Sequence, residues 1–311
     1  MEEADAIQDT DPHAEPSTCF GYRAQTQVAL TACRSGGGAR LRLSEDDLAP
    51  ITTQVPTLEW HEAGRPFARL WANAPEFTLW IDEIGWFAID RRGPSIVLPA
   101  TSSGIRREAR LWGVPAALCF LDRGDLPLHA AAVDINGSAV VFAAPGRHGK
   151  TTLAGAFMAA GHRLLSEDLT CIRTNSQLAV WPGPALLRVR KDVFTQLAFT
   201  RADVVDEDAT RMYVMPDRDS RGTGDAVPLR ALVFLRTHSS DDVELEQVSD
   251  KTESLSDLWT LSFNMPDDGD RARCFASITQ LAAAVPIWNL TRPLTFASLP
   301  RVIHAIEGLV P

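Results

Sequence analysis

No stretch of the sequence is both long enough and apolar enough to cross a lipid bilayer, which takes about 20 predominantly apolar residues in a helix. The first residues also lack the basic segment and the following apolar run that mark a secretory signal. These absences predict a cytoplasmic protein without a membrane partner.

Cysteine is scarce in this chain, and its positions are scattered. The five cysteines are Cys19, Cys33, Cys119, Cys171 and Cys274. Their number is odd, and none forms the close pairing that metal and redox sites use. The sequence therefore predicts reduced, buried thiols.

Positive charge is in short supply as well, with 30 Lys and Arg against 40 Asp and Glu and a formal net charge of -10. Nucleic acids and anionic membranes select for clustered positive charge, so neither is an expected partner. Any phosphate that the chain binds must therefore sit in a local pocket. The length of 311 residues and the 45% hydrophobic content suit one large domain or two modest ones.

By composition, the chain begins with an acidic tail and a β-rich domain. Residues 1–17 are acidic and nearly devoid of large apolar side chains, which predicts a disordered tail because there is little to bury. Residues 18–115 hold short apolar runs between Gly, Pro and acidic clusters, which predicts a small, mainly β domain. The runs are QVALTA (27–32), RLRLS (40–44), EFTLWI (76–81), GWFAID (85–90) and SIVLP (95–99). A helix from Ser103, its expected cap, to Leu121 joins this domain to the next.

The second predicted domain comprises residues 116–311. Two β-rich runs, HAAAVDI and SAVVFAA, are divided by Asn136 and Gly137, the dipeptide that best suits a tight hairpin turn. The pattern further predicts strands at 162–166 and 230–235 and helices at 150–160, 271–284 and 298–309. Residues 201–228 are crowded with charge, Pro and Gly and exceed the usual connection of about 4 to 6 residues. They are expected to be either a functional lid or disordered.

The second β run leads directly into the segment A-P-G-R-H-G-K-T at residues 144–151, called the phosphate loop below. It lacks one residue of the pattern G-x-x-x-x-G-K-[ST], because Ala144 replaces the first glycine. A strand before the loop and a helix after it are the context that phosphate binding requires. The loop therefore predicts a site for ATP and Mg²⁺, although a glycine-rich turn without function is the alternative. The predicted nucleotide-binding residues are Pro145, Gly146, Arg147, His148, Gly149, Lys150, Thr151 and Thr152.

Three further polar residues lie at strand ends in the same unit: His129, Glu167 and Asp168. Phosphoryl transfer needs one carboxylate to hold a metal and another to orient or deprotonate the attacking hydroxyl. A histidine beside alanines is more often a core residue, and an acidic pair after a strand is more often a solvated strand end. Beside a phosphate loop, however, these residues become candidates for the catalytic apparatus.

The segment LHAAAVDINGSAVVFAAPGRHGKTTLAGAFMAAGHRLLSEDLTCI resembles the core of the HPr serine kinase/phosphatase family. The shared order is a histidine, a hairpin, the phosphate loop with its helix, then G-H-R-L and two adjacent acids. The resemblance extends more weakly through WPGPALLRVRKD, PLRALVFL and residues 293–306, and covers nearly all of residues 116–311. It implies an α/β fold: a P-loop kinase domain with a mixed sheet of the HPr kinase and phosphoenolpyruvate carboxykinase type, beside the small mainly β N-terminal domain.

The resemblance also implies roles for individual residues. Lys150 matches the phosphate ligand of the family, and Thr151 matches a magnesium ligand. His129 matches the histidine that supports the catalytic carboxylate. Glu167 takes the place of the family's catalytic aspartate, and Asp168 matches the carboxylate on the metal side.

Arg188 matches a recurring arginine of the relatives, which contacts phosphate or pairs with a surface acid. The N-terminal part looks more like divergent HPr-kinase-related proteins, among them lasso-peptide tailoring kinases that phosphorylate a serine hydroxyl of a precursor peptide. This implies a kinase acting on a peptide or small-molecule hydroxyl. The alternatives are a non-catalytic nucleotide-binding regulatory module and a kinase/phosphatase acting on HPr. Some family members form hexamers, so a homo-oligomer is possible.

Overall fold

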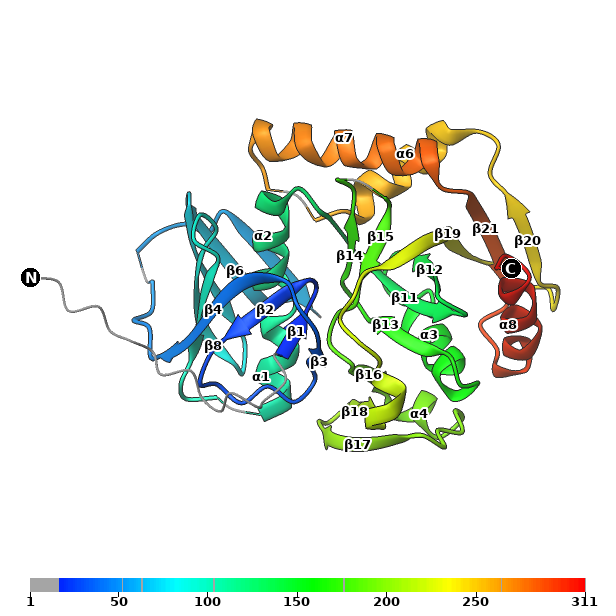
Figure 1. The fold of residues 1–311 in the computed structure, drawn as a ribbon, viewed down its shortest axis with the longest axis horizontal. Helices are drawn as coiled ribbons and strands as arrows, with labels where there is room; N and C mark the ends of the chain where they lie inside the picture. Colours follow the sequence, from blue (N-terminus) through cyan, green and yellow to red (C-terminus); the bar gives the residue numbers. More distant parts are fainter. Residues whose placement is uncertain are drawn as a thin grey trace, which may run out of the picture.

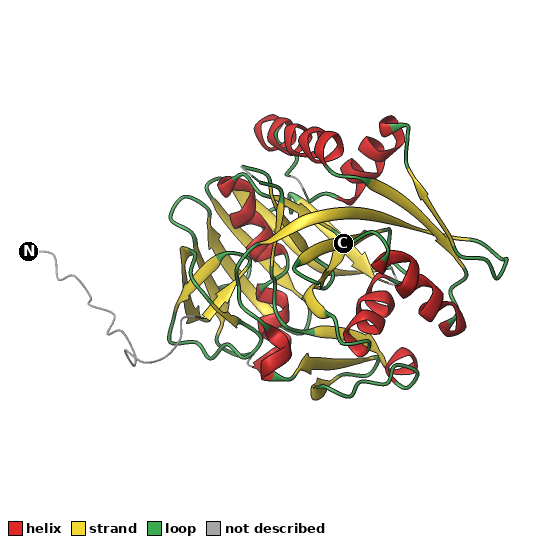
Figure 2. Ribbon diagram, turned by 45° about the vertical axis from the view of Figure 1, so that its right-hand side comes forward, coloured by secondary structure: helices red, strands yellow, loops and turns green. Residues whose placement is uncertain are grey.

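Strands dominate this chain and form two large sheets and one small sheet (Figures 1 and 2). The structure is a computed structural model, and it describes residues 17–310 apart from residues 52, 63, 103, 176 and 264. The tail expected at residues 1–17 lies outside the described residues except for Ser17, which begins the first strand.

The N-terminal sheet has the strand order β3-β1-β2-β4-β9-β8-β7-β6-β5. Its strands are β1 (Ser17–Cys19), β2 (Tyr22–Gln25), β3 (Arg34–Ser35), β4 (Ala39–Asp46), β5 (Leu58–Glu62), β6 (Arg65–Asn73), β7 (Glu76–Ile81), β8 (Gly85–Asp90) and β9 (Ser95–Pro99). Strands β4, β7, β8 and β9 confirm four of the predicted runs. Their side chains alternate between the core and the other face, which is the pattern that made them visible in the sequence.

The run at residues 27–32, expected as a strand, is a loop instead. Thr31 and Ala32 donate their backbone N–H groups to the carboxylate of Glu108, at 2.7 and 2.9 Å. This carboxylate replaces the neighbouring strand that would otherwise satisfy the backbone. Because Glu108 is distant in sequence, local alternation could not reveal it.

Two helices take the place of the single helix expected at residues 103–121. They are α1 (Gly104–Leu111) and α2 (Val114–Arg123), and the expected cap Ser103 lies outside the described residues. Pro115 stands in the first turn of α2, where its missing N–H costs nothing, and so favours a new helix start. The domain division expected after residue 115 falls within α2, whose buried side chains pack into the core of the N-terminal sheet. In Figure 1 both helices lie between the two large sheets.

The second large sheet is mixed, with the order β10-β14-β15-β19-β12-β11-β13, and β21 pairs with β19 and β20. Its strands are β10 (Leu126–Leu128), β11 (Ala130–Ile135), β12 (Ser138–Ala143), β13 (Arg163–Ser166), β14 (Thr170–Arg173), β15 (Ala179–Trp181), β19 (Val227–Thr237), β20 (Glu244–Gln247) and β21 (Ile287–Arg292). β11 and β12 form the predicted hairpin, and Asn136 and Gly137 take positive φ angles of 53° and 80°. Strands β12, β19 and β21 are parallel, so their C-terminal ends meet at one edge of the sheet.

Residues 201–228 are ordered, so the disordered alternative is wrong. They contain β17 (Ala202–Glu207), β18 (Arg211–Pro216) and the short helix α5 (Arg218–Arg221). The two strands join β16 (Leu187–Arg190) in a three-stranded sheet with the order β16-β18-β17. β17 is exposed along most of its length, so its sequence carries no alternating apolar signal. A lid function for this segment stays a hypothesis.

The remaining helices lie mostly around the second sheet (Figure 1). They are α3 (Lys150–Ala159), α4 (Lys191–Phe194), α6 (Lys251–Leu261), α7 (Asp268–Ala284), the 3-10 turn η1 (Phe296–Ser298) and α8 (Leu299–Glu307). α3, α7 and α8 confirm three predicted helices within a few residues, whereas α6 was not predicted. Among the described helices, none has the length and apolar content to span a bilayer. All five cysteines are free thiols, and all but the half-buried Cys33 are buried.

Candidate functional site

The phosphate loop connects the end of β12 to the start of α3, at the edge where the parallel strands end. Ala144 is buried and does not take a positive φ, so its Cβ does not distort the turn. The left-handed positions are Arg147, at φ 66°, and Gly149, at φ 81°. Gly149 is the N-cap of α3 and provides no side-chain cap, so the first N–H groups of the helix remain free to bind an anion.

Lys150 points into the loop rather than into solvent, and the residue is 7% exposed. Its Nζ lies 2.7 Å from the carbonyl oxygen of Ala144, 3.1 Å from that of Pro145 and 2.9 Å from Nε2 of His129. Burial lowers the pKa of Lys150, and the carboxylates of Glu167 and Asp168 partly offset this effect. The amine is thus held in a site of reduced solvation, where a charge interacts strongly with a bound anion.

His129 links this lysine to one of the two acids. It lies between β10 and β11, and its Nδ1 is 3.1 Å from the carbonyl oxygen of Asp168 and 3.3 Å from Oδ1 of the same residue. An ammonium group can only donate hydrogen bonds, so Nε2 must accept from Lys150. The proton is therefore assigned to Nδ1, which donates to Asp168.

The acidic pair follows β13, and its two members have different surroundings. Glu167 has a side chain that is 5% exposed, and its Oε1 accepts a 2.7 Å hydrogen bond from Oγ1 of Thr151. The side chain of Asp168 is 48% exposed and turns away on a backbone with φ 68°. Neighbouring carboxylates in the sequence thus face different partners.

Arg188, on β16, bridges both acids. Its Nε donates to Oε2 of Glu167 at 3.2 Å, and its Nη2 donates to Oδ2 of Asp168 at 2.6 Å. Removal from water alone would raise the pKa of Asp168, but Arg188 and His129 outweigh this effect and hold it well below its ordinary value. Both carboxylates also raise the pKa of Arg188, against the opposing effect of its burial.

The structure therefore brings together six of the predicted site residues: His129, Lys150, Thr151, Glu167, Asp168 and Arg188. The pairing differs from what the family resemblance implied, because the histidine contacts Asp168 and the threonine contacts Glu167. The other predicted loop residues are less engaged. Nδ1 of His148 lies 2.9 Å from the carbonyl oxygen of Gly146, and Pro145, Gly146 and Arg147 are exposed. Thr152, in the first turn of α3, is half-buried.

The oxygen atoms of Thr151 and Glu167 are suitable ligands for Mg²⁺. The ion is usually held by one or two carboxylates together with phosphate oxygens, and a phosphate-loop hydroxyl is a common additional ligand. The adjacent oxygens of Thr151 and Glu167 provide such a set. In the described part of the chain, no group of three or more His, Cys, Asp and Glu side chains could hold a metal by itself.

No protein-family model matches this chain, and no curated protein matches it either. Among solved structures, it is similar to the Hpr(Ser) kinase/phosphatase from Coxiella burnetii, with 12% identity over 59% of this chain and 87% of that chain and a TM-score of 0.29. A score this low does not establish a shared fold. The mixed α/β architecture follows from the sheets themselves, and the function must be argued from the site.

One residue beside the loop was missed by the sequence interpretation. Arg292, at the end of β21, is so close to Gly149 that a Cβ built on the glycine would lie 2.6 Å from Nη2 of the arginine. No short motif marks this position. Only the parallel pairing of β21 with β19, and of β19 with β12, brings it to the loop.

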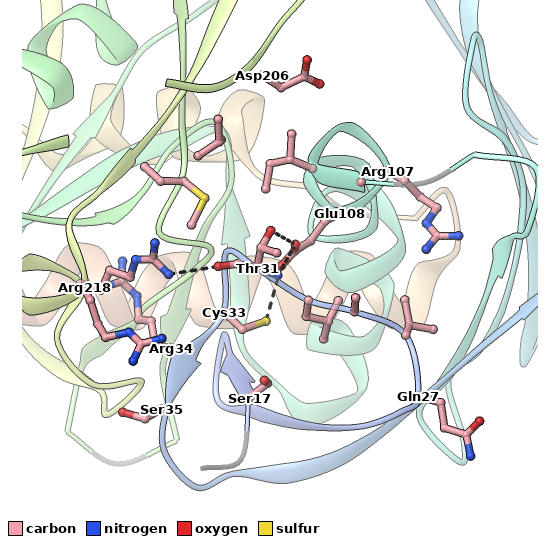
Figure 3. A pocket seen from close by; sticks show the side chains of 18 of the residues that line it. Ser17, Gln27, Thr31, Cys33, Arg34, Ser35, Arg107, Glu108, Asp206 and Arg218 are labelled. Atoms are coloured by element: carbon pink, nitrogen blue, oxygen red, sulfur yellow. Dashed lines mark hydrogen bonds between the residues drawn. The ribbon is translucent and has the colours of Figure 1, made fainter. Parts of the chain in front are cut away.

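A large cavity of about 1240 Å³ lies away from the phosphate loop, between the first N-terminal strands, α1 and the β17–β18 sheet (Figure 3). None of the six residues of the bonded network lines it. Glu108, buried at its wall, accepts hydrogen bonds from Thr31 and Ala32 and so fixes the loop of residues 27–32. The carboxylate thus has a structural role, and the cavity is separate from the candidate site.

Proposed function

We propose that this chain is an ATP-dependent phosphotransferase that uses Mg²⁺ and acts on a serine-like hydroxyl of a peptide precursor or small molecule. The observation that carries the proposal is the bonded network in which Lys150 reaches Asp168 through His129, Thr151 contacts Glu167, and Arg188 joins the two acids. A glycine-rich turn without function would not require these polar groups to converge. Phosphoryl transfer does require them, because its catalysis consists mainly of positioning and charge neutralisation.

The loop supplies the phosphate-binding half of the proposed site. The free N–H groups at the start of α3 and the partly desolvated Lys150 both favour negative charge at the same place. Bound MgATP would supply the phosphoryl group and a divalent cation to neutralise its oxygens. Thr151 and Glu167 would hold the cation, since their oxygens are already adjacent.

Asp168 and His129 supply the acceptor half. The half-exposed carboxylate is accessible to an incoming hydroxyl, and the histidine fixes its orientation. A carboxylate with a depressed pKa is a weak base, so its main task would be to orient the hydroxyl and to accept a proton late in the transfer. These roles for Glu167 and Asp168 are the reverse of those that the family resemblance implies.

One observation favours a second candidate, a nucleotide-binding module without catalysis. Arg188 pairs with both acids, and an arginine that neutralises them competes with a metal and with an acceptor. Under this alternative the network would stabilise the fold around a bound nucleotide. Turnover distinguishes the two candidates.

The direct test is mass spectrometry of candidate acceptors after incubation with the protein, ATP and Mg²⁺. The acceptors would include precursor peptides with a serine, free hydroxyl compounds, and HPr. We expect the mass of one phosphate on a peptide or small-molecule hydroxyl. ATP binding without phosphate on any acceptor would favour the regulatory module, and phosphate on HPr would favour the kinase/phosphatase alternative.

Replacement of the loop lysine tests the same proposal in the protein. Lys150→Ala should lower transfer by about two to four orders of magnitude, because it removes a charge aimed at the transferring group. Lys191→Ala is a matched control, since that lysine pairs with Glu207 at the surface. Equal initial rates for Lys150→Ala and the unmodified protein would refute the assignment of the loop.

A further inference from the structure

Arg292 is buried without the partners that a buried arginine normally has. The residue is 2% exposed, and charged side chains are almost never buried this far unless they are paired. Its Nη1 donates to the carbonyl oxygen of Pro293 at 3.3 Å. Within the described residues, Nε and Nη2 are buried and have no hydrogen-bond partner.

The electrostatic surroundings of Arg292 are equally unfavourable. Burial lowers its pKa, and no carboxylate among the residues that the structure describes contributes an opposing effect. The contrast with Arg188 is clear, because two acids raise the pKa of that arginine despite its burial. A buried cation without a counter-charge is costly, so Arg292 requires an explanation that the protein alone does not provide.

The position of the guanidinium supplies that explanation. β12, β19 and β21 run parallel, with Ala143 opposite Phe234 and Thr237 opposite Arg292, so Arg292 and the phosphate loop leave the sheet at the same edge. The close approach of Nη2 to Gly149 puts the side chain against the N-cap of α3. The helix end is itself positive, and Lys150 is the next residue. The guanidinium of Arg292 thus lies beside the N-terminus of α3 in the phosphate loop.

We propose that Arg292 is a phosphate-binding residue of this site and donates its Nε and Nη2 hydrogens to a phosphate group of the bound nucleotide. The inference rests on the proposed function, in which the loop binds a nucleoside triphosphate. The guanidinium presents planar, paired donors that match two phosphate oxygens, a geometry that a lysine cannot reproduce. The position of Arg292 is a second reason for a glycine at residue 149, besides the positive φ. Any side chain there would displace the guanidinium.

The test compares ATP affinity, by calorimetry, in the unmodified protein and in Arg292→Met, which keeps an unbranched apolar stem and removes the guanidinium with its charge. Loss of charge-assisted hydrogen bonds should weaken ATP binding by about 10- to 100-fold. Adenosine affinity should stay unchanged, because adenosine has no phosphate. Without nucleotide, the melting temperature should stay equal or rise, since an unpaired buried charge has been removed.

Arg34→Met is the matched control. Arg34 is also buried, but it donates to the carbonyl oxygens of Gly183 and Leu164, at 3.1 and 2.6 Å, away from the phosphate loop. This variant should lose stability and keep its ATP affinity. A purely structural role for Arg292 would give the same result at position 292 and would overturn the proposal.

The outcomes distinguish failure of the Arg292 proposal from failure of the proposed function. If the unmodified protein binds ATP and Arg292→Met binds it equally well, the Arg292 proposal fails while the proposed function survives. If the unmodified protein binds neither ATP nor pyrophosphate, both fail. Should Arg292→Met not fold, Arg292→Lys takes its place: several-fold weaker ATP binding is expected from loss of the paired donors, and unchanged affinity overturns the proposal.

Discussion

At the scale of single residues, adjacent positions in the sequence can have separate tasks. Glu167 is buried against Thr151, whereas Asp168 is half-exposed against His129. The positive φ of Asp168 makes the difference, because it turns the second carboxylate away from the first. Aspartate adopts a left-handed conformation more readily than most residues other than glycine, and Arg188 and His129 hold the side chain of Asp168 in place.

The two carboxylates should therefore respond differently to neutralisation. Glu167→Gln should weaken the binding of MgATP, because it removes a charged oxygen beside Thr151. Asp168→Asn should leave MgATP binding nearly unchanged and lower turnover by about two to four orders of magnitude, since it removes the group that we propose orients the acceptor. Separate measurement of ATP dissociation constants and of turnover at saturating ATP checks both expectations.

The two variants serve as controls for each other. The reverse result, with normal binding in Glu167→Gln and lost binding in Asp168→Asn, would restore the roles that the family resemblance implies. Loss of ATP binding in both would instead indicate one shared site in which Arg188 couples the acids.

Six residues of the candidate site could be predicted from the sequence, but Arg292 and the pairing within the site could not. The phosphate loop is a contiguous motif, and its flanking strand and helix have clear sequence patterns. Residues 144–151 could therefore be recognised from the sequence. The partner of each acid depends on one backbone angle at Asp168 and on Arg188, which comes from another sheet. Arg292 was not visible at all, because only the pairing of distant strands brings it to Gly149.

At the scale of elements, strands that bury alternate side chains could be predicted from the sequence, and segments without that pattern could not. β7, β8 and β9 bury alternate side chains, and they match the sequence prediction residue for residue. β17 has little buried surface, and the run at residues 27–32 is organised by Glu108. A local sequence pattern does not predict the conformation of a segment that is determined by contacts with residues distant in the sequence.

The first strands contact the second sheet through residues that are far apart in the sequence. Phe20 follows β1, is fully buried, and donates its N–H to the carbonyl oxygen of Pro182 at 2.7 Å. A Cβ built on Gly183 would lie 2.5 Å from the Phe20 ring. The glycine is therefore required for close packing of these two segments.

Gly183→Ala should destabilise the protein by about 1–3 kcal/mol, because the added methyl group overpacks a core that cannot shift freely. Urea denaturation would show this as a lower midpoint with an unchanged slope. Gly37→Ala is the control, since a Cβ there has nothing within 4 Å. Equal midpoints for both variants would show that the Phe20 contact yields easily.

At the scale of the whole molecule, an ion-pair cluster ties α7 to the N-terminal sheet. Arg91, just after β8, donates from Nη1 and Nη2 to the two carboxylate oxygens of Asp270, at 2.9 and 3.1 Å. Asp270 is 1% exposed and Arg91 is 7% exposed. Arg91 also pairs with Asp122 on α2, so one guanidinium joins the first sheet to two helices. The N-terminal sheet thus supports an element that also covers the second sheet.

This cluster predicts a specific dependence of stability on pH. Burial alone would raise the pKa of Asp270, but its bonds to Arg91 outweigh that effect and lower it. A carboxylate with a depressed pKa in the folded state stabilises the protein above the unfolded value of about 4, and this contribution disappears as pH falls through the folded value.

Asp270→Asn should consequently cost roughly 3 kcal/mol near neutral pH, because it leaves Arg91 buried with half of its counter-charge. The cost should shrink below about pH 4, where the unfolded chain takes up a proton on Asp270 while the folded protein still keeps the charge. Urea denaturation of both proteins across this range measures the difference, with Asp192→Asn as a control whose surface pair with Arg190 should contribute nothing measurable. A difference between the two proteins that stays constant with pH would mean that Asp270 acts through its shape and hydrogen bonds, and not through its charge.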